Sequence, residues 1–246
     1  MDLNNTAHFV MQSKGGAGKS VCSTILAQYL KDKTAGEVSF IDTDPSNKTL
    51  GSYQALNVQM IDVIGVDKVV DQSKFDGFIN DFIESNKGML VDTGSGDFLA
   101  INNYIYNNNI PEIFNEMGKN LIIHCPINYG QASLETIKCL TMLLENYPNV
   151  SIIVWANEFF GRGEKDLADT KLVKSNKNII GVVTIAKKNV DTDEKDFSKM
   201  LDHFMTFDEV KSTEDKSLFG FIQKTRIERT RKELYEQLDN IFGKSE

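Results

Sequence analysis

Short apolar runs alternate with longer segments of mixed polarity along most of the chain. The runs are β-branched or otherwise apolar and predict strands at residues 8–12, 37–43, 89–92, 121–127, 151–157 and 179–185. The segments between them predict helices at residues 19–33, 75–86, 98–117 and 131–146, the third with a break near Pro111. This alternation predicts an α/β fold in which helices cover both faces of a mostly parallel central sheet.

The composition changes after the last predicted strand, and residues 190–246 form a charged, helical C-terminal portion of what we expect to be one domain over residues 1–246. Helices are predicted at 193–203 and 215–242. In the second helix, apolar residues recur at helical spacing. Basic residues lie beside them, but acidic residues within the same helix reduce its positive charge. This pattern favours packing against the sheet over membrane binding. The apolar positions are Ile227, Leu234, Leu238, Ile241 and Phe242.

Composition narrows the class of protein. With 246 residues, 41% of them apolar, the chain has enough material for a full core. Its apolar runs are too short to cross a bilayer and its first residues lack the features of a signal peptide, so we expect a cytoplasmic protein without stable membrane insertion. The net charge of −8 argues against a surface that is basic all over. Cys22, Cys125 and Cys139 are widely spaced and predict neither a disulfide framework nor a metal site.

The segment SKGGAGKS at residues 13–20 follows a predicted strand and opens a predicted helix, which is the context of a phosphate-binding loop. Its glycines allow backbone N–H groups to line an anion site at a helix N-terminus. Lys19 is predicted to reach the β- and γ-phosphates of ATP, and the Ser20 hydroxyl to coordinate Mg²⁺. The alternative, a tight turn without a ligand, does not explain the Lys-Ser pair. The predicted nucleotide contacts are Gly15, Gly16, Ala17, Gly18, Lys19, Ser20 and Val21.

The loop departs from the ordinary P-loop pattern, because Ser13 stands in place of the first glycine and Lys14 precedes the glycine pair. In this it resembles the deviant Walker A loop of the ParA/MinD family of ATPases. The resemblance implies a P-loop NTPase fold, slow ATP hydrolysis and a nucleotide-dependent homodimer. It also implies that Lys14 reaches the phosphates bound by the partner subunit; the alternative is a solvated lysine on an exposed loop.

Acidic residues end two of the predicted strands. Asp42 and Asp44 lie two residues apart and so share one face, at the sheet edge beside the phosphate loop. Matched to the family's switch I motif, Asp44 orients or activates the attacking water and Asp42 supports the Mg²⁺ shell, although both also suit a turn-capping role. Asp92 resembles the Walker B and switch II aspartate that holds Mg²⁺ through water, but Gly94 occurs in a turn where relatives often carry proline.

Asn157 closes another apolar strand, at a position where family members commonly have an asparagine that reads adenine. Capping of the following turn is an equally open interpretation. His8, His124 and His203 show no metal-ligand spacing, and structural roles are favoured for them.

Segments beyond the ATPase motifs, at residues 41–45, 53–58, 154–157, 196–201 and 206–208, resemble the TraL group of conjugal-transfer proteins. That resemblance implies a molecular switch in plasmid conjugation, with partners among relaxosome or type IV secretion proteins. One alternative is a partition-type DNA-binding ATPase, for which a basic patch on the C-terminal helices is the discriminating sign. The other is a small-molecule kinase, although the sequence has no arginine-rich lid.

Overall fold

A parallel sheet forms the centre of the protein. The computed structural model describes residues 1–44, 49–65, 67, 69–159 and 161–243, so Pro45 of the segment 41–45 lies outside the described residues. Within them, seven strands pair in the order β3-β2-β4-β1-β5-β6-β7, every neighbouring pair parallel. The strands are β1 (Thr6–Val10), β2 (Val38–Asp42), β3 (Gln59–Met60), β4 (Gly88–Asp92), β5 (Asn120–Asn128), β6 (Ser151–Asn157) and β7 (Ile179–Ile185).

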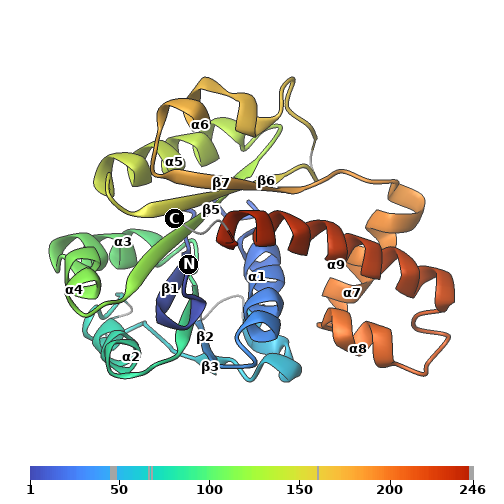
Figure 1. Cartoon of the computed structure of the whole chain (residues 1–246), viewed down its shortest axis with the longest axis horizontal. Helices are drawn as coiled ribbons and strands as arrows, with labels where there is room; N and C mark the ends of the chain where they lie inside the picture. The colour runs from blue at the N-terminus through green and yellow to red at the C-terminus, as the bar shows by residue number, and fades with distance from the viewer. Residues whose placement is uncertain (45–48, 66, 68, 160, 244–246) are drawn as a thin grey trace.

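Helices cover both faces of this sheet, which confirms the predicted α/β architecture (Figure 1). One face carries α2 (Ser73–Glu84), α3 (Phe98–Asn107), α4 (Ile110–Glu116), α5 (Ser133–Asn146) and α6 (Lys171–Ser175). The other carries α1 (Lys19–Lys33), α7 (Lys195–Asp202), α8 (Phe207–Ser212) and α9 (Phe221–Phe242). Each face has its own apolar core, as expected for a sheet buried on both sides.

The C-terminal helix α9 packs on the sheet through its apolar stripe, as its spacing predicts. Ile227, Leu234, Leu238 and Phe242 are all buried, and the helix lies along β7. In the described part of the chain, no helix is both long and apolar enough to span a membrane.

Several boundaries differ from the sequence predictions. The last helix begins at Phe221 rather than at residue 215, because the Asp215 carboxylate accepts hydrogen bonds from the backbone of Ser217 and Leu218 and turns the chain. The break between α3 and α4 comes at Asn109, whose φ of 50° ends the helical path just before Pro111. The short elements β3, α6 and α8 were not predicted; both residues of β3 are exposed and carry no apolar pattern.

The order of the strands places the phosphate loop at a topological switch point. The chain leaves β1 for β2 on one side and later reaches β5 on the other, so β1 lies between β4 and β5. Open parallel sheets bind ligands beyond the carboxyl ends of their strands at such a point. The loops after β1, β2, β4 and β6 therefore meet at one edge.

A buried hydrogen-bonded chain crosses three strands beneath α9. The Trp155 indole N–H donates to His124 Nδ1 at 3.0 Å, and His124 Nε2 lies 3.0 Å from His8 Nδ1. Because an indole can only donate, His124 carries its proton on Nε2 and donates it to His8. Burial lowers the pKa of His8 to about 3 and that of His124 well below its usual value, so both rings are neutral. This arrangement fits the structural role predicted for these histidines.

Candidate functional site

The phosphate loop leads directly from β1 into α1. Gly16 and Gly18 have φ values of 73° and 99°, a region that favours glycine, and Gly18 is the N-cap of α1. Two side-chain amides from neighbouring strands donate to the loop's carbonyl oxygens, Asn128 to Gly16 at 3.5 Å and Asn157 to Ala17 at 3.3 Å. These bonds attach the loop to the ends of β5 and β6.

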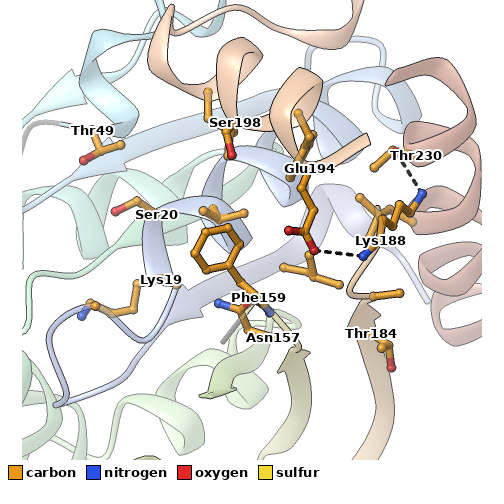
Figure 2. Close-up of a pocket in the computed structure, with 18 of the residues that line it drawn as sticks. Lys19, Ser20, Thr49, Asn157, Phe159, Thr184, Lys188, Glu194, Ser198 and Thr230 are labelled. Atoms are coloured by element: carbon orange, nitrogen blue, oxygen red, sulfur yellow. Dashed lines mark hydrogen bonds between the residues drawn. The ribbon is translucent and has the colours of Figure 1, made fainter. Parts of the chain in front are cut away.

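A cavity of about 770 Å³ opens beside this loop (Figure 2). Lys14, Ala17, Asp42 and Asp92 are predicted site residues that do not line it. The cavity thus brings the phosphate loop, the loop after β2 and the end of β6 together around one space. Its lining includes eight of the predicted residues: Gly15, Gly16, Gly18, Lys19, Ser20, Val21, Asp44 and Asn157.

Lys19 is a cation held in a largely buried position at the start of α1. Lys19 is 8% exposed, and burial lowers the pKa of its ammonium group. The carboxylates of Asp92, Asp44 and Asp97 act in the opposite direction and favour the charged form. A desolvated cation at a helix N-terminus is a strong donor for phosphate oxygens.

The carboxylates behind the loop are buried and close to one another. Asp92 accepts a 2.7 Å hydrogen bond from the Ser23 hydroxyl, and burial raises its pKa to about 7, with the charges of Asp42 and Asp44 adding to the effect. The Asp42 carboxylate accepts from the backbone N–H groups of Asp44 at 2.9 Å and Gly51 at 3.0 Å. Asp42 therefore shapes the loop that carries Asp44, and its predicted part in the Mg²⁺ shell stays a prediction.

The donor set at this edge fits Mg²⁺. Within the described residues no cluster of three or more His, Cys, Asp or Glu side chains forms a metal cage. Mg²⁺ in nucleotide sites does not need one, because it keeps waters and takes phosphate oxygens beside one or two protein groups. The Ser20 hydroxyl lines the cavity, and the raised pKa of Asp92 marks carboxylates that a nearby cation would stabilise in the charged form.

The raised pKa of Asp92 predicts a pH-dependent effect of Asp92→Asn on the nucleotide-free protein. Because the pKa rises from 3.8 to about 7 on folding, stability linked to the bound proton is present below pH 3.8 and is lost as the pH rises to about 7. The asparagine variant does not titrate, so its stability advantage over wild type should widen by about 3 kcal/mol between about pH 5 and about pH 8. Urea denaturation at both pH values measures this; a constant difference would contradict the burial of an ionisable Asp92.

Asn157 lies under the phosphate loop, and both ends of its amide are engaged. Its Nδ2 donates to Ala17, and its Oδ1 accepts from the backbone N–H of Phe159 at 3.2 Å. A Cβ at Gly18 would lie only 2.4 Å from Asn157 Nδ2, so the two residues pack in direct contact. These contacts match the turn-capping interpretation and add support of the loop; the adenine-reading role stays a prediction.

Much of the cavity wall comes from residues that were not predicted as part of the site. Phe159 projects into the cavity near Ser20 and Glu194 (Figure 2). Beyond it, the wall comes from the end of β7, from α7 and from α9, where Lys188 donates to Thr230 at 3.0 Å. The C-terminal helical portion is therefore part of the pocket wall as well as a cover for the sheet. This part of the cavity is lined by Thr184, Phe197, Ser198, Leu201, Leu234 and Gln237, among others.

Lys14 lies outside the cavity and forms an ion pair on the surface. Its ammonium nitrogen lies 2.6 Å from Glu135 Oε2 near the start of α5, and the two side chains are 41% and 56% exposed. The Lys14 side chain is thus engaged at the surface of its own chain and not in the cavity. Glu135 carries no motif and was not predicted.

The fold and the site together define a P-loop nucleotide-binding protein. The family model described as "CobQ/CobB/MinD/ParA nucleotide binding domain" matches residues 8–244. The chain belongs to this CobQ/CobB/MinD/ParA family, which confirms the resemblance inferred from residues 13–20.

Known proteins resemble the chain along nearly its whole length. Two proteins named TraL from Escherichia coli are 32% and 29% identical to it, over 94% and 95% of this chain and 96% and 97% of their own. The MinD cell division protein of Aquifex aeolicus has the same fold, with a TM-score of 0.50 over 98% of both chains at 17% identity. The resemblance to the TraL group is thereby confirmed.

Proposed function

We propose that this protein is a Mg²⁺-dependent ATPase that cycles between a monomer and a nucleotide-bound homodimer in the cytoplasm, as a molecular switch in plasmid conjugation. Slow hydrolysis sets the lifetime of the dimer, and the result of each cycle is a change between the dimer and the monomer. The conjugation role rests on the similarity to the TraL proteins of Escherichia coli. Partners among relaxosome or type IV secretion proteins are part of this proposal.

One observation carries the ATPase proposal. The cavity is lined by Lys19 and Ser20, at the N-terminus of α1, and by Asp44 from the loop after β2. Lys19 would bind the phosphates, Ser20 and Asp92 would hold Mg²⁺, and Asp44 would orient the attacking water. When bound, Mg²⁺ neutralises charge that develops on the phosphate oxygens.

The dimer proposal is supported by the position of Lys14. Lys14 does not line the cavity of its own chain, and its ammonium group pairs with Glu135 at the surface, where a facing subunit could reach it. Its ion pair with Glu135 is exposed and so contributes little energy. Exchange of Glu135 for the phosphates of a facing subunit replaces one carboxylate by a more highly charged anion.

Glu135→Gln should therefore favour the ATP-bound dimer. The variant removes the charge that competes for Lys14 in the monomer, and we expect the dimer dissociation constant with Mg²⁺-ATP to fall by about two- to fivefold, as an exposed ion pair allows. Analytical ultracentrifugation of wild type, Glu135→Gln and Lys14→Ala measures this. Equal dimer affinity in wild type and Glu135→Gln would show that the pair has no part in assembly.

Phosphate release measured with Mg²⁺-ATP, beside light scattering with ATP, ADP and no nucleotide, tests the proposed function. We expect slow hydrolysis of ATP. We also expect a dimer in the presence of ATP and a monomer with ADP or without nucleotide. A protein that binds ATP but neither hydrolyses it nor changes its assembly would contradict the proposal while leaving the family assignment intact.

The structure does not favour the partition-type alternative. The arginines of α9 that could form a basic patch are paired within the chain: Arg226 with Asp196 at 2.7 Å, and Arg231 with Asp208 at 2.8 Å. Arg229 pairs in the same way with Asp193. Arg226 and Arg231 are also mostly buried, so they are less available to DNA phosphates than arginines of an open basic patch.

A further inference from the structure

Asp97 is a buried acid beside the site that none of the motifs includes. It immediately precedes α3 and is 3% exposed. Its Oδ2 accepts a 2.6 Å hydrogen bond from the Thr43 hydroxyl, whereas its Oδ1 has no hydrogen-bond partner within the described residues. Leaving a buried carboxylate oxygen unpartnered is destabilising, so the position calls for an explanation in function.

Gly94 shows what the unpartnered oxygen faces. A Cβ at Gly94 would lie 2.7 Å from Asp97 Oδ1 and 3.1 Å from Asp44 Cγ. The two carboxyl groups therefore lie close to the same point, and a side chain at position 94 would force the Asp97 carboxyl group to move. Burial raises the pKa of Asp97 to about 6, and the charge of Asp44 adds to this rise, so the two groups repel each other when both are ionised.

Asp97 also joins two loops that meet at the phosphate site. Thr43, directly before Asp44, donates its backbone N–H to the carbonyl of Asp92 at 3.0 Å. Its hydroxyl then donates to Asp97, beyond the turn at residues 93–96. The loop after β2 is thus bonded, through Thr43, to Asp92 before the turn that follows β4 and to Asp97 after it.

We propose that Asp97 is a positioning residue for Asp44. It fixes the backbone that carries Asp44 through Thr43, and its second oxygen, across Gly94, directs the Asp44 carboxylate by repulsion toward the cavity that Asp44 lines. Asp97 does not line the cavity itself and acts only through Asp44. This inference rests on the proposed ATPase function and extends it.

Three substitutions separate the two contributions of Asp97. Asp97→Asn keeps the shape and the acceptor for Thr43 but presents an amide donor to Asp44, which draws that carboxylate out of the cavity instead of repelling it. Thr43→Val removes the hydroxyl at nearly constant volume, and Thr43→Ser restores it. We expect kcat to fall about 10- to 100-fold in Asp97→Asn and Thr43→Val, and ATP affinity to change by less than about twofold. Thr43→Ser should keep near-wild-type kcat.

Amide hydrogen exchange of the nucleotide-free proteins gives a second readout that does not need chemistry. Exchange at residues 43–44 and 93–97 should be faster in Thr43→Val than in wild type and Thr43→Ser. Unchanged exchange in Thr43→Val, or ATP affinity that falls in proportion to kcat in Asp97→Asn, would overturn the inference. A wild-type protein that binds but does not hydrolyse ATP would overturn the proposed function, and the exchange data would then still decide whether Asp97 holds the Asp44 loop.

Discussion

Lys19→Ala is expected to raise the dissociation constant for Mg²⁺-ATP by at least about 100-fold, which corresponds to about 2.7 kcal/mol. Lys19 is a desolvated cation at the first position of α1, and its ammonium group lies among carboxylates that would otherwise repel the phosphates. The substitution therefore removes a charge-assisted donor and leaves a net negative site. Isothermal titration calorimetry with ATP measures the loss.

Two controls make this result specific. Lys14→Ala removes a lysine from the same loop that lies outside the cavity, and it should bind ATP with wild-type affinity as a monomer. Lys19→Met retains the aliphatic stem and tests whether the charge rather than the packing is responsible. Unchanged affinity in Lys19→Ala would show that the phosphate site is wrongly assigned.

Asp44→Ala should stop hydrolysis and leave an ATP-bound dimer. Asp44 lines the cavity, and loss of a general base or water-orienting carboxylate lowers turnover by about 10²- to 10⁴-fold. Its backbone N–H, not its side chain, bonds to Asp42, so the loop keeps this anchor in the variant. Removal of a negative charge beside the phosphates should leave ATP affinity equal to wild type or higher. Phosphate release and light scattering, run together, separate turnover from assembly.

Lys14→Ala is the matched control for Asp44→Ala, because it should fail at formation of the dimer, before hydrolysis. It is expected to keep ATP binding while losing both the dimer and hydrolysis. If wild type stays monomeric with ATP at all accessible concentrations and Lys14→Ala hydrolyses normally, the dimer mechanism must be abandoned although the phosphate site survives.

The sequence predicted those parts of the fold that local patterns determine. The bounds of α1, β6 and β7 agree with the predictions residue for residue, since apolar runs define the two strands and Gly18 and Gly36 lie at the two ends of α1. The helix α8 was missed although Thr206 and Glu209 form a capping box that the sequence displays. The strand β3 gave no such signal, because its pairing with β2 arises only in the folded chain.

The same distinction applies to the site. Residues 13–20 are contiguous, so their chemistry could be inferred from spacing alone. Asp97 and Glu135 could not, because their partners lie far away in the chain: the bond from Thr43 to Asp97 spans 54 positions. Asp97 follows a glycine-rich turn at the start of a helix, which resembles an ordinary capping position. Only the packing of the two loops shows that it lies close to Asp44.

The hydrogen-bonded chain beneath α9 gives the protein an intrinsic optical reporter. Trp155 is the only tryptophan of the sequence, and its indole is fully buried two positions before Asn157. Its fluorescence therefore comes from one known environment, where it donates to a neutral histidine. Unfolding will transfer that single indole from the core to water, so emission follows global stability without a label, and a shift of β6 on nucleotide binding will register in the same signal.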